Sequence, residues 1–455
     1  MKSPCLASPF LAFVALICLP WTISLAQQQE ASWPSWRGPE HTGVAPSGTP
    51  PTEWSEDSAT WKVDLPGRGN ATPIVWGNRI FIATAIETDR AADAASDEPA
   101  AEEPPQGPGG RRGGRFGRGS SKPTNYYQYV AMCLDLETGK TLWQKTAIEA
   151  VPSEAGHSDN THASASPVTD GKHVYFFFGS QGLYCYTLDG DLVWSTDLGD
   201  MQTRAGFGEG ASPALHGDTL VVNWDHEGPS FITALDANTG QPRWKKDRDE
   251  RTTWVTPLIV EAAGKTQVIV NGSNRTRSYD LTNGDVIWEC GGQVGNPIPS
   301  PVIFENLAIC MSGYRGAAIL AIPLDSTGDV TNSETIAWQS ERNAPYVPSP
   351  LLYGERLYYI KSNNGILSIA NARTGELLVS AQRLGDISNV YASPVGADGR
   401  VYIAGRDGTT MVLADSDEYQ VLATNRLDEG IDATPVVVGG KLLIRGYDHL
   451  FCFGE

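Results

Sequence analysis

The sequence predicts an all-β fold, an eight-bladed β-propeller of four-stranded antiparallel blades. Two observations predict it. A hydroxylated residue followed by proline recurs eight times, and from Pro167 to Pro435 successive prolines lie 41 to 49 residues apart, the period of a propeller blade. Each period also holds four short β-branched or aromatic runs separated by Gly/Asp turns. The eight pairs are Thr72-Pro73, Ser166-Pro167, Ser212-Pro213, Thr256-Pro257, Ser300-Pro301, Ser349-Pro350, Ser393-Pro394 and Thr434-Pro435.

The two ends of the chain predict how the ring closes. The last repeat ends at Glu455 after only three strand-like runs, whereas Trp61 lies in a further run, ATWKVDL, before the first anchor. We therefore expect the N-terminal strand to complete the last blade, which removes open sheet edges. This gives one propeller domain over residues 59–455, preceded by an N-terminal extension over residues 27–58.

The composition excludes some classes of function. The 455 residues include 48 Gly and 30 Pro, a turn-rich globular composition. Lys and Arg number 34 against 53 Asp and Glu, so the formal charge is −19. General nucleic-acid binding needs a basic footprint, and an anionic membrane surface needs one too, so neither partner is expected.

The first residues are typical of a secretory signal. An apolar run over residues 10–19 precedes Ser24-Leu25-Ala26, which places small residues at the −3 and −1 positions of a cleavage site. We expect a signal peptide over residues 1–26, and a periplasmic or secreted, monomeric protein. The run is too short to span a bilayer, and Ile17 before Cys18 is not the small residue that a lipoprotein signal requires.

The cysteines do not form a recognisable framework. Five remain after the signal peptide, an odd and widely spaced set, and no Cys-x-x-Cys pair suggests zinc, redox exchange or covalent haem. Each lies in an apolar strand-like run, which predicts a buried, inert thiol. They are Cys133, Cys185, Cys290, Cys310 and Cys452.

Residues 87–125 interrupt the first repeat. Seven acidic residues between Glu87 and Glu103 are followed by the segment GGRRGGRFGRGSSK with five basic residues. Proline, glycine and charge exclude a packed core there, so we expect a flexible, solvated insertion in the first blade.

The repeats resemble a known family. Segments such as LDLETGKTLW (134–143) and LDANTGQPRW (235–244) resemble the pyrroloquinoline quinone (PQQ)-type propeller repeat over roughly residues 33–455. That family includes quinoprotein alcohol dehydrogenases and non-catalytic assembly lipoproteins of the BamB type. The opening WPSWRGP resembles a third branch, secreted bacterial PQQ-like propellers without an assigned reaction. The resemblance implies the fold and leaves the function open.

One face of the ring collects the candidate ligand-binding residues. Because strands alternate in direction, connections between blades and between the second and third strands emerge together, at the mouth of the central channel. The candidates are His157, Asp159, His162, Arg204, Asp225, His226, Glu227, Arg251, Trp254, Arg275, Arg277, Tyr314 and Arg315. The same face also collects Arg68, Asn70, Glu209, Asn296, Tyr346, Asn389, Tyr391, Arg406 and Asp432.

Each acidic and histidine cluster has a functional and a structural interpretation. His157, Asp159 and His162 offer metal-ligand chemistry, or else hydrogen-bond the backbone of their own connection. The consecutive Asp225, His226 and Glu227 offer a cation site or an acid/base pair, or else point in different directions from a strand turn. No metal is assigned to either cluster.

The arginines and aromatic residues have two interpretations as well. Arg251, Arg275 and Arg277 suit a carboxylate-rich ligand, or else neutralise the acids around Asp225. Trp254 and the Tyr314-Arg315 pair suit stacking on a flat ligand, or else cap the ring core.

The favoured function is a non-catalytic, exported scaffold that binds an envelope or extracellular protein or a small ligand, without a cofactor. The alternative is a PQQ- and Ca²⁺-dependent quinoprotein dehydrogenase, although the chain lacks the adjacent cysteine pair typical of the alcohol-oxidising branch. A third hypothesis, hydrolytic or carbohydrate-directed chemistry, lacks a Gly-x-Ser-x-Gly or His-Glu-x-x-His motif.

Overall fold

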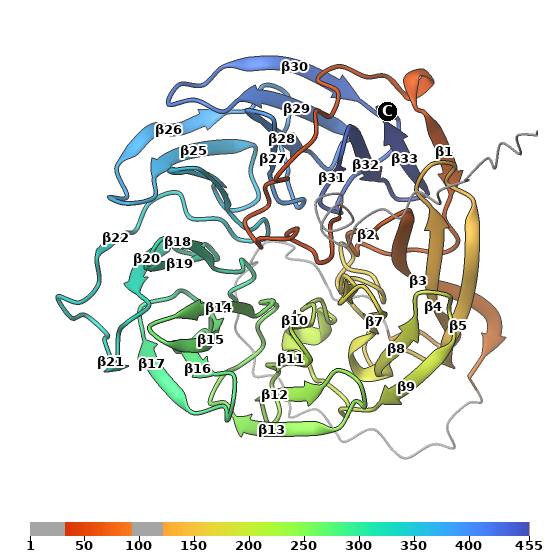
Figure 1. The fold of residues 1–455 in the computed structure, drawn as a ribbon, viewed down its shortest axis with the longest axis horizontal. Coiled ribbons are helices and arrows are strands. Elements are labelled where there is room, and N and C mark those ends of the chain that lie inside the picture. Colours follow the sequence, from red (N-terminus) through yellow and green to blue (C-terminus); the bar gives the residue numbers. More distant parts are fainter. Residues whose placement is uncertain (1–31, 93–121, 455) are drawn as a thin grey trace, which may run out of the picture.

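The computed structural model describes residues 32–92 and 122–454. These residues form eight β-sheets arranged in a ring around a central axis (Figure 1), which confirms the predicted propeller. Consecutive strands of each blade pair antiparallel, with the first strand innermost and the fourth at the rim. Among the described residues, no helix is long and apolar enough to cross a membrane.

The strands follow the chain order blade by blade. Blades 1 to 4 contain β2 (Ile74–Trp76), β3 (Arg79–Ala91), β4 (Asn125–Asp135), β5 (Thr141–Ala150); β6 (Val168–Thr169), β7 (His173–Phe177), β8 (Leu183–Thr187), β9 (Leu192–Thr196); β10 (Ala214–His216), β11 (Thr219–Trp224), β12 (Phe231–Asp236), β13 (Pro242–Asp247); and β14 (Leu258–Ala262), β15 (Lys265–Val270), β16 (Thr276–Asp280), β17 (Val286–Cys290). Blades 5 to 8 contain β18 (Val302–Phe304), β19 (Leu307–Ser312), β20 (Ala318–Pro323), β22 (Trp338–Ser340); β23 (Leu351–Tyr353), β24 (Arg356–Ile360), β25 (Ile366–Asn371), β26 (Leu377–Arg383); β27 (Val395–Ala397), β28 (Arg400–Ala404), β29 (Thr409–Ala414), β30 (Val421–Arg426); and β31 (Val436–Val438), β32 (Lys441–Arg445), β33 (His449–Phe453), β1 (Trp61–Asp64). A two-residue strand, β21 (Gly328–Asp329), adds a parallel edge to β17, and three short 3₁₀ turns occur at η1 (Glu56–Ser58), η2 (Gly179–Gln181) and η3 (Arg204–Gly206).

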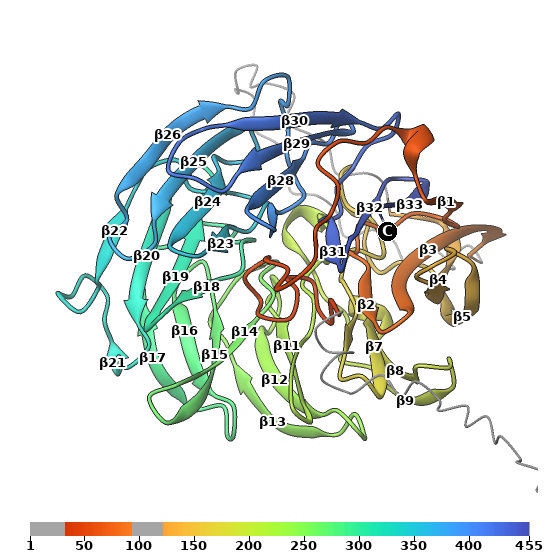
Figure 2. The ribbon, with the colours of Figure 1, turned by 45° about the horizontal axis from the view of Figure 1, so that its top comes forward.

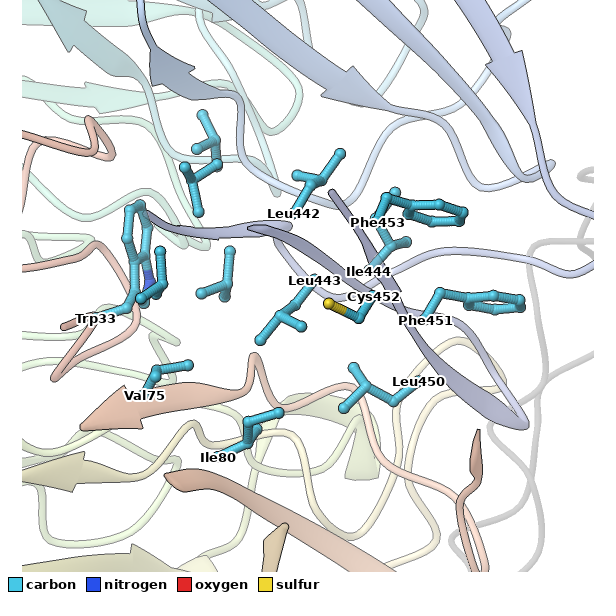
Figure 3. Packing of buried hydrophobic residues seen from close by; sticks show 14 of the residues in the cluster. Trp33, Val75, Ile80, Leu442, Leu443, Ile444, Leu450, Phe451, Cys452 and Phe453 are labelled. Carbon is cyan, nitrogen blue, oxygen red and sulfur yellow. The ribbon is translucent and has the colours of Figure 1, made fainter. Parts of the chain in front are cut away.

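The N-terminal strand closes the ring as predicted. β1 pairs antiparallel with β33, with Trp61 opposite Cys452 and Asp64 opposite His449. The first and last strands of the propeller therefore lie in one blade, and a dense apolar cluster joins this blade to blade 1 (Figure 3).

The hydroxyl of each Ser/Thr-Pro anchor explains the repeat. The backbone N–H of Thr72 donates to Ser166 Oγ at 2.9 Å, and this link repeats around the ring until the N–H of Thr434 donates to Thr72 Oγ1 at 3.1 Å. Seven such links are present among the eight anchors. Between Thr256 and Ser300 the polarity reverses, because Ser300 Oγ donates to the Thr256 carbonyl at 2.9 Å. We call this circle of side chains the hydroxyl ring. It satisfies the backbone N–H at seven of the eight anchors.

The tryptophans of the outer strands join neighbouring blades. Trp143 Nε1 donates to the Leu188 carbonyl at 2.9 Å, and its indole covers Gly190, which has φ of +89°. A Cβ at Gly190 would meet that indole at 2.8 Å. The turn therefore needs glycine both for its left-handed backbone and for contact with the ring. The same pairing recurs at Trp61, Trp194, Trp244 and Trp338.

The N-terminal extension lies across the centre of the ring (Figure 2). Trp33 is fully buried and exchanges backbone hydrogen bonds with Val75 at 2.8 and 2.9 Å. The buried guanidinium of Arg37 donates to the carbonyls of Pro350 and Pro394 at 2.8 and 3.1 Å. Trp36 Nε1 donates to Thr434 Oγ1 at 3.2 Å, so the extension reaches the hydroxyl ring.

The insertion in blade 1 is shorter than predicted at its ends. β3 and β4 remain paired out to Ala91 opposite Asn125, so residues 87–91 and Asn125 are strand rather than loop. Residues 87–91 are polar apart from Ala91, so no apolar pattern marks them as strand. The remainder of the predicted insertion, over residues 93–121, and the predicted signal peptide lie outside the described residues.

The five cysteines are free thiols inside strands, as predicted. Burial raises the pKa of Cys133 to about 12 and that of Cys290 to about 11. Their thiolates are therefore scarce at neutral pH, and these residues serve the core.

Candidate binding site at the channel mouth

The channel mouth opens into a cavity of about 580 Å³, which we call the central cavity. Its walls are the connections between blades, and its floor combines Trp36 from the extension with members of the hydroxyl ring. These floor residues are Thr72, Ser166, Ser212, Thr256 and Thr434. The volume is within the range of small-ligand sites.

One wall is aromatic and cationic. The rings of Tyr314 and Tyr346 lie 4.9 Å apart, and the guanidinium of Arg315 lies 5.2 Å from the Tyr314 ring. Arg204 Nη1 donates to Asn296 Oδ1 at 2.8 Å. Both arginines are exposed, and neither pairs with a carboxylate in the described part of the chain. This wall therefore presents two uncompensated positive charges to a ligand.

The opposite wall holds the carboxylates, and these are already engaged. Arg406 binds both oxygens of Asp432 at 2.7 and 3.0 Å and lies 3.2 Å from Asp159. Tyr391 donates its hydroxyl to Asp159 at 3.0 Å, and its ring lies 4.1 Å from the Arg406 guanidinium. Burial raises the pKa of Asp432, against the opposing effect of Arg406. The guanidinium of Arg406 thus pairs with both carboxylates, Asp159 and Asp432.

A second, smaller cavity of about 50 Å³ lies beside the first, and Ser164 and Trp254 line both. Its central group is Glu209, which accepts hydrogen bonds from the Ser180 backbone N–H at 2.7 Å and from the Ser180 hydroxyl. Burial raises the pKa of Glu209 to about 7 despite these bonds. The cavity is too small for a substrate beyond water size.

The structure places the predicted candidates in three groups. Six of them line the central cavity: His157, Asp159, Arg204, Trp254, Tyr314 and Arg315. His162 lines the small cavity, and its ring makes an edge contact with Tyr127 at 4.8 Å. Arg251 is exposed and lines neither of these cavities.

The histidines of the 157–162 connection are turned to different surroundings. His157 Nδ1 accepts the backbone N–H of Asp159 at 3.2 Å, which is the structural interpretation of this segment. No group of three or more His, Cys, Asp or Glu side chains suited to a metal ion occurs within residues 32–92 and 122–454.

The side chains of the consecutive Asp225, His226 and Glu227 contact different partners. Asp225 is buried against Arg248 at 2.7 and 3.0 Å, while His226 Nδ1 accepts the Gln202 N–H at 3.0 Å. Glu227 is exposed and accepts a hydrogen bond from Thr252 Oγ1 at 2.8 Å. These three side chains do not form one site.

Arg275 and Arg277 neutralise acids of their own blade. Arg277 is buried and pairs with Glu250 and Glu289, each at 3.0 Å. Arg275 pairs with Glu289 at 3.2 Å and with Asp329 at 2.7 Å. Arg248, which sequence reasoning did not single out, holds Asp225 instead. Trp36 was also missed, because nothing in the extension indicates that it reaches the channel.

Comparison with known proteins identifies the family. The family model described as "Outer membrane protein assembly factor BamB" matches residues 128–378, more than half of the chain. The chain belongs to this BamB family. The BamB protein of Yersinia pestis is 24% identical to it over 331 residues, covering 70% of this chain and 77% of that protein. The Escherichia coli (strain K12) protein is 25% identical over 331 residues, covering 62% and 78%.

Solved structures show the same fold for this BamB-family chain. BamB from Moraxella catarrhalis superposes with a TM-score of 0.54 at 15% identity, covering 72% of this chain and 94% of that one. The quinohemoprotein alcohol dehydrogenase from Comamonas testosteroni superposes with a TM-score of 0.60 at 9% identity, covering 94% and 81%. At these identities the likeness concerns the propeller fold alone.

Proposed function

We propose that this protein is an exported, non-catalytic propeller that binds partner proteins in the cell envelope. The observation that carries the proposal is the match to the assembly-factor family over residues 128–378. The relatives are named outer membrane assembly factors, and we extend to this chain only the role of an interaction scaffold.

The architecture supports this role. The hydroxyl ring and the tryptophan contacts join every blade to its neighbours, so the ring holds its loops on a rigid base. The mouth face presents the exposed Arg204, Arg251 and Arg315 on a chain whose formal charge is −19. Local positive charge on an acidic protein favours a partner segment that is itself acidic.

The quinoprotein alternative fits the cavity less well. A cavity of about 580 Å³ is large enough for a tricyclic cofactor. A Ca²⁺ ion beside it would need carboxylate oxygens, and substrate oxidation would need a carboxylate able to accept a proton. Asp159 and Asp432 both contact Arg406, so the residues present do not fit that pair of requirements.

Site-specific photo-crosslinking tests the scaffold proposal. A photoreactive amino acid is placed at Ser158 or Ala205, two exposed positions of the mouth face, and at Asn238, in the β12–β13 turn on the opposite face. We expect defined protein adducts in the producing cell from the mouth positions and none from Asn238. Absence of adducts at the mouth, or the same adducts from both faces, would refute it.

Export is tested separately from binding. Mass spectrometry of the envelope fraction should find a mature N-terminus at Gln27 if residues 1–26 are a removed signal peptide. An intact N-terminus in the cytoplasmic fraction would contradict the exported part of the proposal and leave the crosslinking result unaffected.

A further inference from the structure

The floor of the central cavity carries hydroxyl groups that accept hydrogen bonds from backbone N–H groups. Ser166 Oγ accepts the Thr72 N–H at 2.9 Å, and Ser212 Oγ accepts the Ser166 N–H at 2.9 Å. Thr434 Oγ1 accepts two bonds, from the Ser393 N–H at 3.1 Å and from Trp36 Nε1 at 3.2 Å. A hydroxyl that accepts still has one proton to give.

In the described part of the chain, no acceptor receives those protons. Within the described ranges, none of the hydroxyls of Thr72, Ser166, Ser212, Thr256 or Thr434 donates a hydrogen bond to another group. Four of these side chains are only 2–6% exposed, namely Thr72, Ser166, Ser212 and Thr434. Buried donors of this kind favour a ligand that brings oxygen acceptors to the floor.

Side chains at the side and the mouth of the cavity add further hydrogen-bond donors. His157 Nδ1 accepts the Asp159 N–H, so the neutral ring carries its proton on Nε2. Arg204 and Arg315 at the mouth are exposed and have no carboxylate partner among the described residues. The carboxylates across the cavity are held by Arg406, so they do not cancel these charges.

We propose that the central cavity binds an acidic saccharide, a small ring-shaped sugar with a carboxylate, of the uronic acid type. The carboxylate lies between Arg204 and Arg315, because guanidinium groups bind carboxylates in a two-pronged geometry. The apolar faces of the sugar rings lie against Trp36, Trp254 and Tyr314.

The distribution of donors decides between ligand classes. Donors lie on the floor, on one side and at the mouth, which suits a ligand that carries oxygen atoms around its whole circumference. A flat hydrocarbon acid has acceptors at one end only and would leave the floor donors unpaired. The cavity volume of about 580 Å³ accommodates a disaccharide.

Isothermal titration calorimetry with the purified mature chain tests this inference. The probes are digalacturonate, the neutral galactose disaccharide of the same linkage, and benzoate. We expect digalacturonate to bind at least tenfold more tightly than either of the other two. The double variant R204Q/R315Q should lose at least tenfold in affinity for digalacturonate.

The matched control removes one exposed arginine elsewhere. Arg373 lies in the turn after β25 and pairs with Glu305 at 2.6 and 2.7 Å, so R373Q should bind digalacturonate like the unaltered chain. A second measurement, chemical protection, uses the unaltered chain. Digalacturonate should protect Arg204 and Arg315 from phenylglyoxal, read by mass spectrometry, and should leave Arg373 reactive.

Several results would overturn the inference: no binding of digalacturonate, equal binding of the neutral sugar, tighter binding of benzoate, or full affinity in R204Q/R315Q. The inference rests on the proposed function only in placing binding at the mouth face. Because the titration uses the purified chain alone, its failure is distinguishable from a failure of the crosslinking in cells.

Discussion

The buried pair between Asp225 and Arg248 gives the sharpest prediction of stability. Both side chains are fully buried, and Arg248 binds the two carboxylate oxygens at 2.7 and 3.0 Å. Asp225 also accepts Thr253 Oγ1 at 2.7 Å and Asn223 Nδ2 at 3.2 Å. Burial acts most strongly, to lower the pKa of Arg248, but Asp225, Tyr279 and Glu250 together raise that pKa. Because arginine keeps its proton in proteins, the guanidinium stays charged when Asp225 is removed.

The substitution Asp225→Ala should destabilise the propeller by about 3–5 kcal/mol, because it leaves the buried charge of Arg248 unpaired and removes the acceptor of the Thr253 hydroxyl. Urea unfolding followed by tryptophan fluorescence measures the change. Asp225→Asn should cost less, since the amide oxygen still accepts one bond.

The matched control is the pair of Asp218 with Arg243 in the same blade. These residues lie 2.7 Å apart, and the Asp218 side chain is 62% exposed. Asp218→Asn should therefore change the unfolding free energy by about 1 kcal/mol or less. Equal small effects at Asp218 and Asp225 would refute the argument that burial sets the difference.

Three further substitutions test the inter-blade contacts and the buried carboxyl group. Ser349→Ala removes the acceptor of a neighbouring anchor N–H and should cost about 1–3 kcal/mol in urea unfolding, whereas the exposed Ser158→Ala should cost almost nothing. Gly190→Ala and Gly217→Ala both place a Cβ at positive φ, but only the Cβ at position 190 meets an indole. The melting temperature should therefore fall further in Gly190→Ala than in Gly217→Ala. Equal shifts would contradict the packing argument. Because burial raises the pKa of Glu209 to about 7, the stability it contributes is complete below its unfolded pKa and declines as pH rises through 7. The loss between pH 5 and pH 8, on the order of 2 kcal/mol, should be smaller in Glu209→Gln, and identical pH profiles would exclude this role.

The fold could be predicted because each repeat carries its own structural chemistry. The Ser/Thr hydroxyl, the turn Gly and the outer-strand Trp all make contacts to the next blade, and these contacts recur in every period where the residues recur. A local signal repeated eight times fixes the number of blades and the closing strand. The sequence does not indicate that β3 continues past residue 87, because the pairing there rests on backbone hydrogen bonds rather than on apolar side chains.

The sequence predicts which face of the ring holds the site, but not which side chains meet there. Chain order places a connection at the mouth, and six of the thirteen candidates line the central cavity. Which side chains meet depends on contacts across the ring, such as that between Tyr391 and Asp159, which are 232 residues apart. The pairing of Asp225 with Arg248 depends on the direction of each side chain at a strand end, which sequence spacing does not reveal.

The hydroxyl ring links the stability of the fold to the chemistry of its cavity. Its oxygens accept backbone N–H groups between blades, and its hydroxyl protons at the cavity floor donate to no other group in the described part of the chain. Trp36 from the extension donates its indole N–H to Thr434 of the same ring and lines the cavity. The hydroxyl ring therefore both joins the blades and lines the cavity floor with hydrogen-bond donors. Cations on the loops above that have no carboxylate partner then complete an anion-binding cavity. Arg204 and Arg315 supply them, whereas Arg406 neutralises the carboxylates that would oppose them.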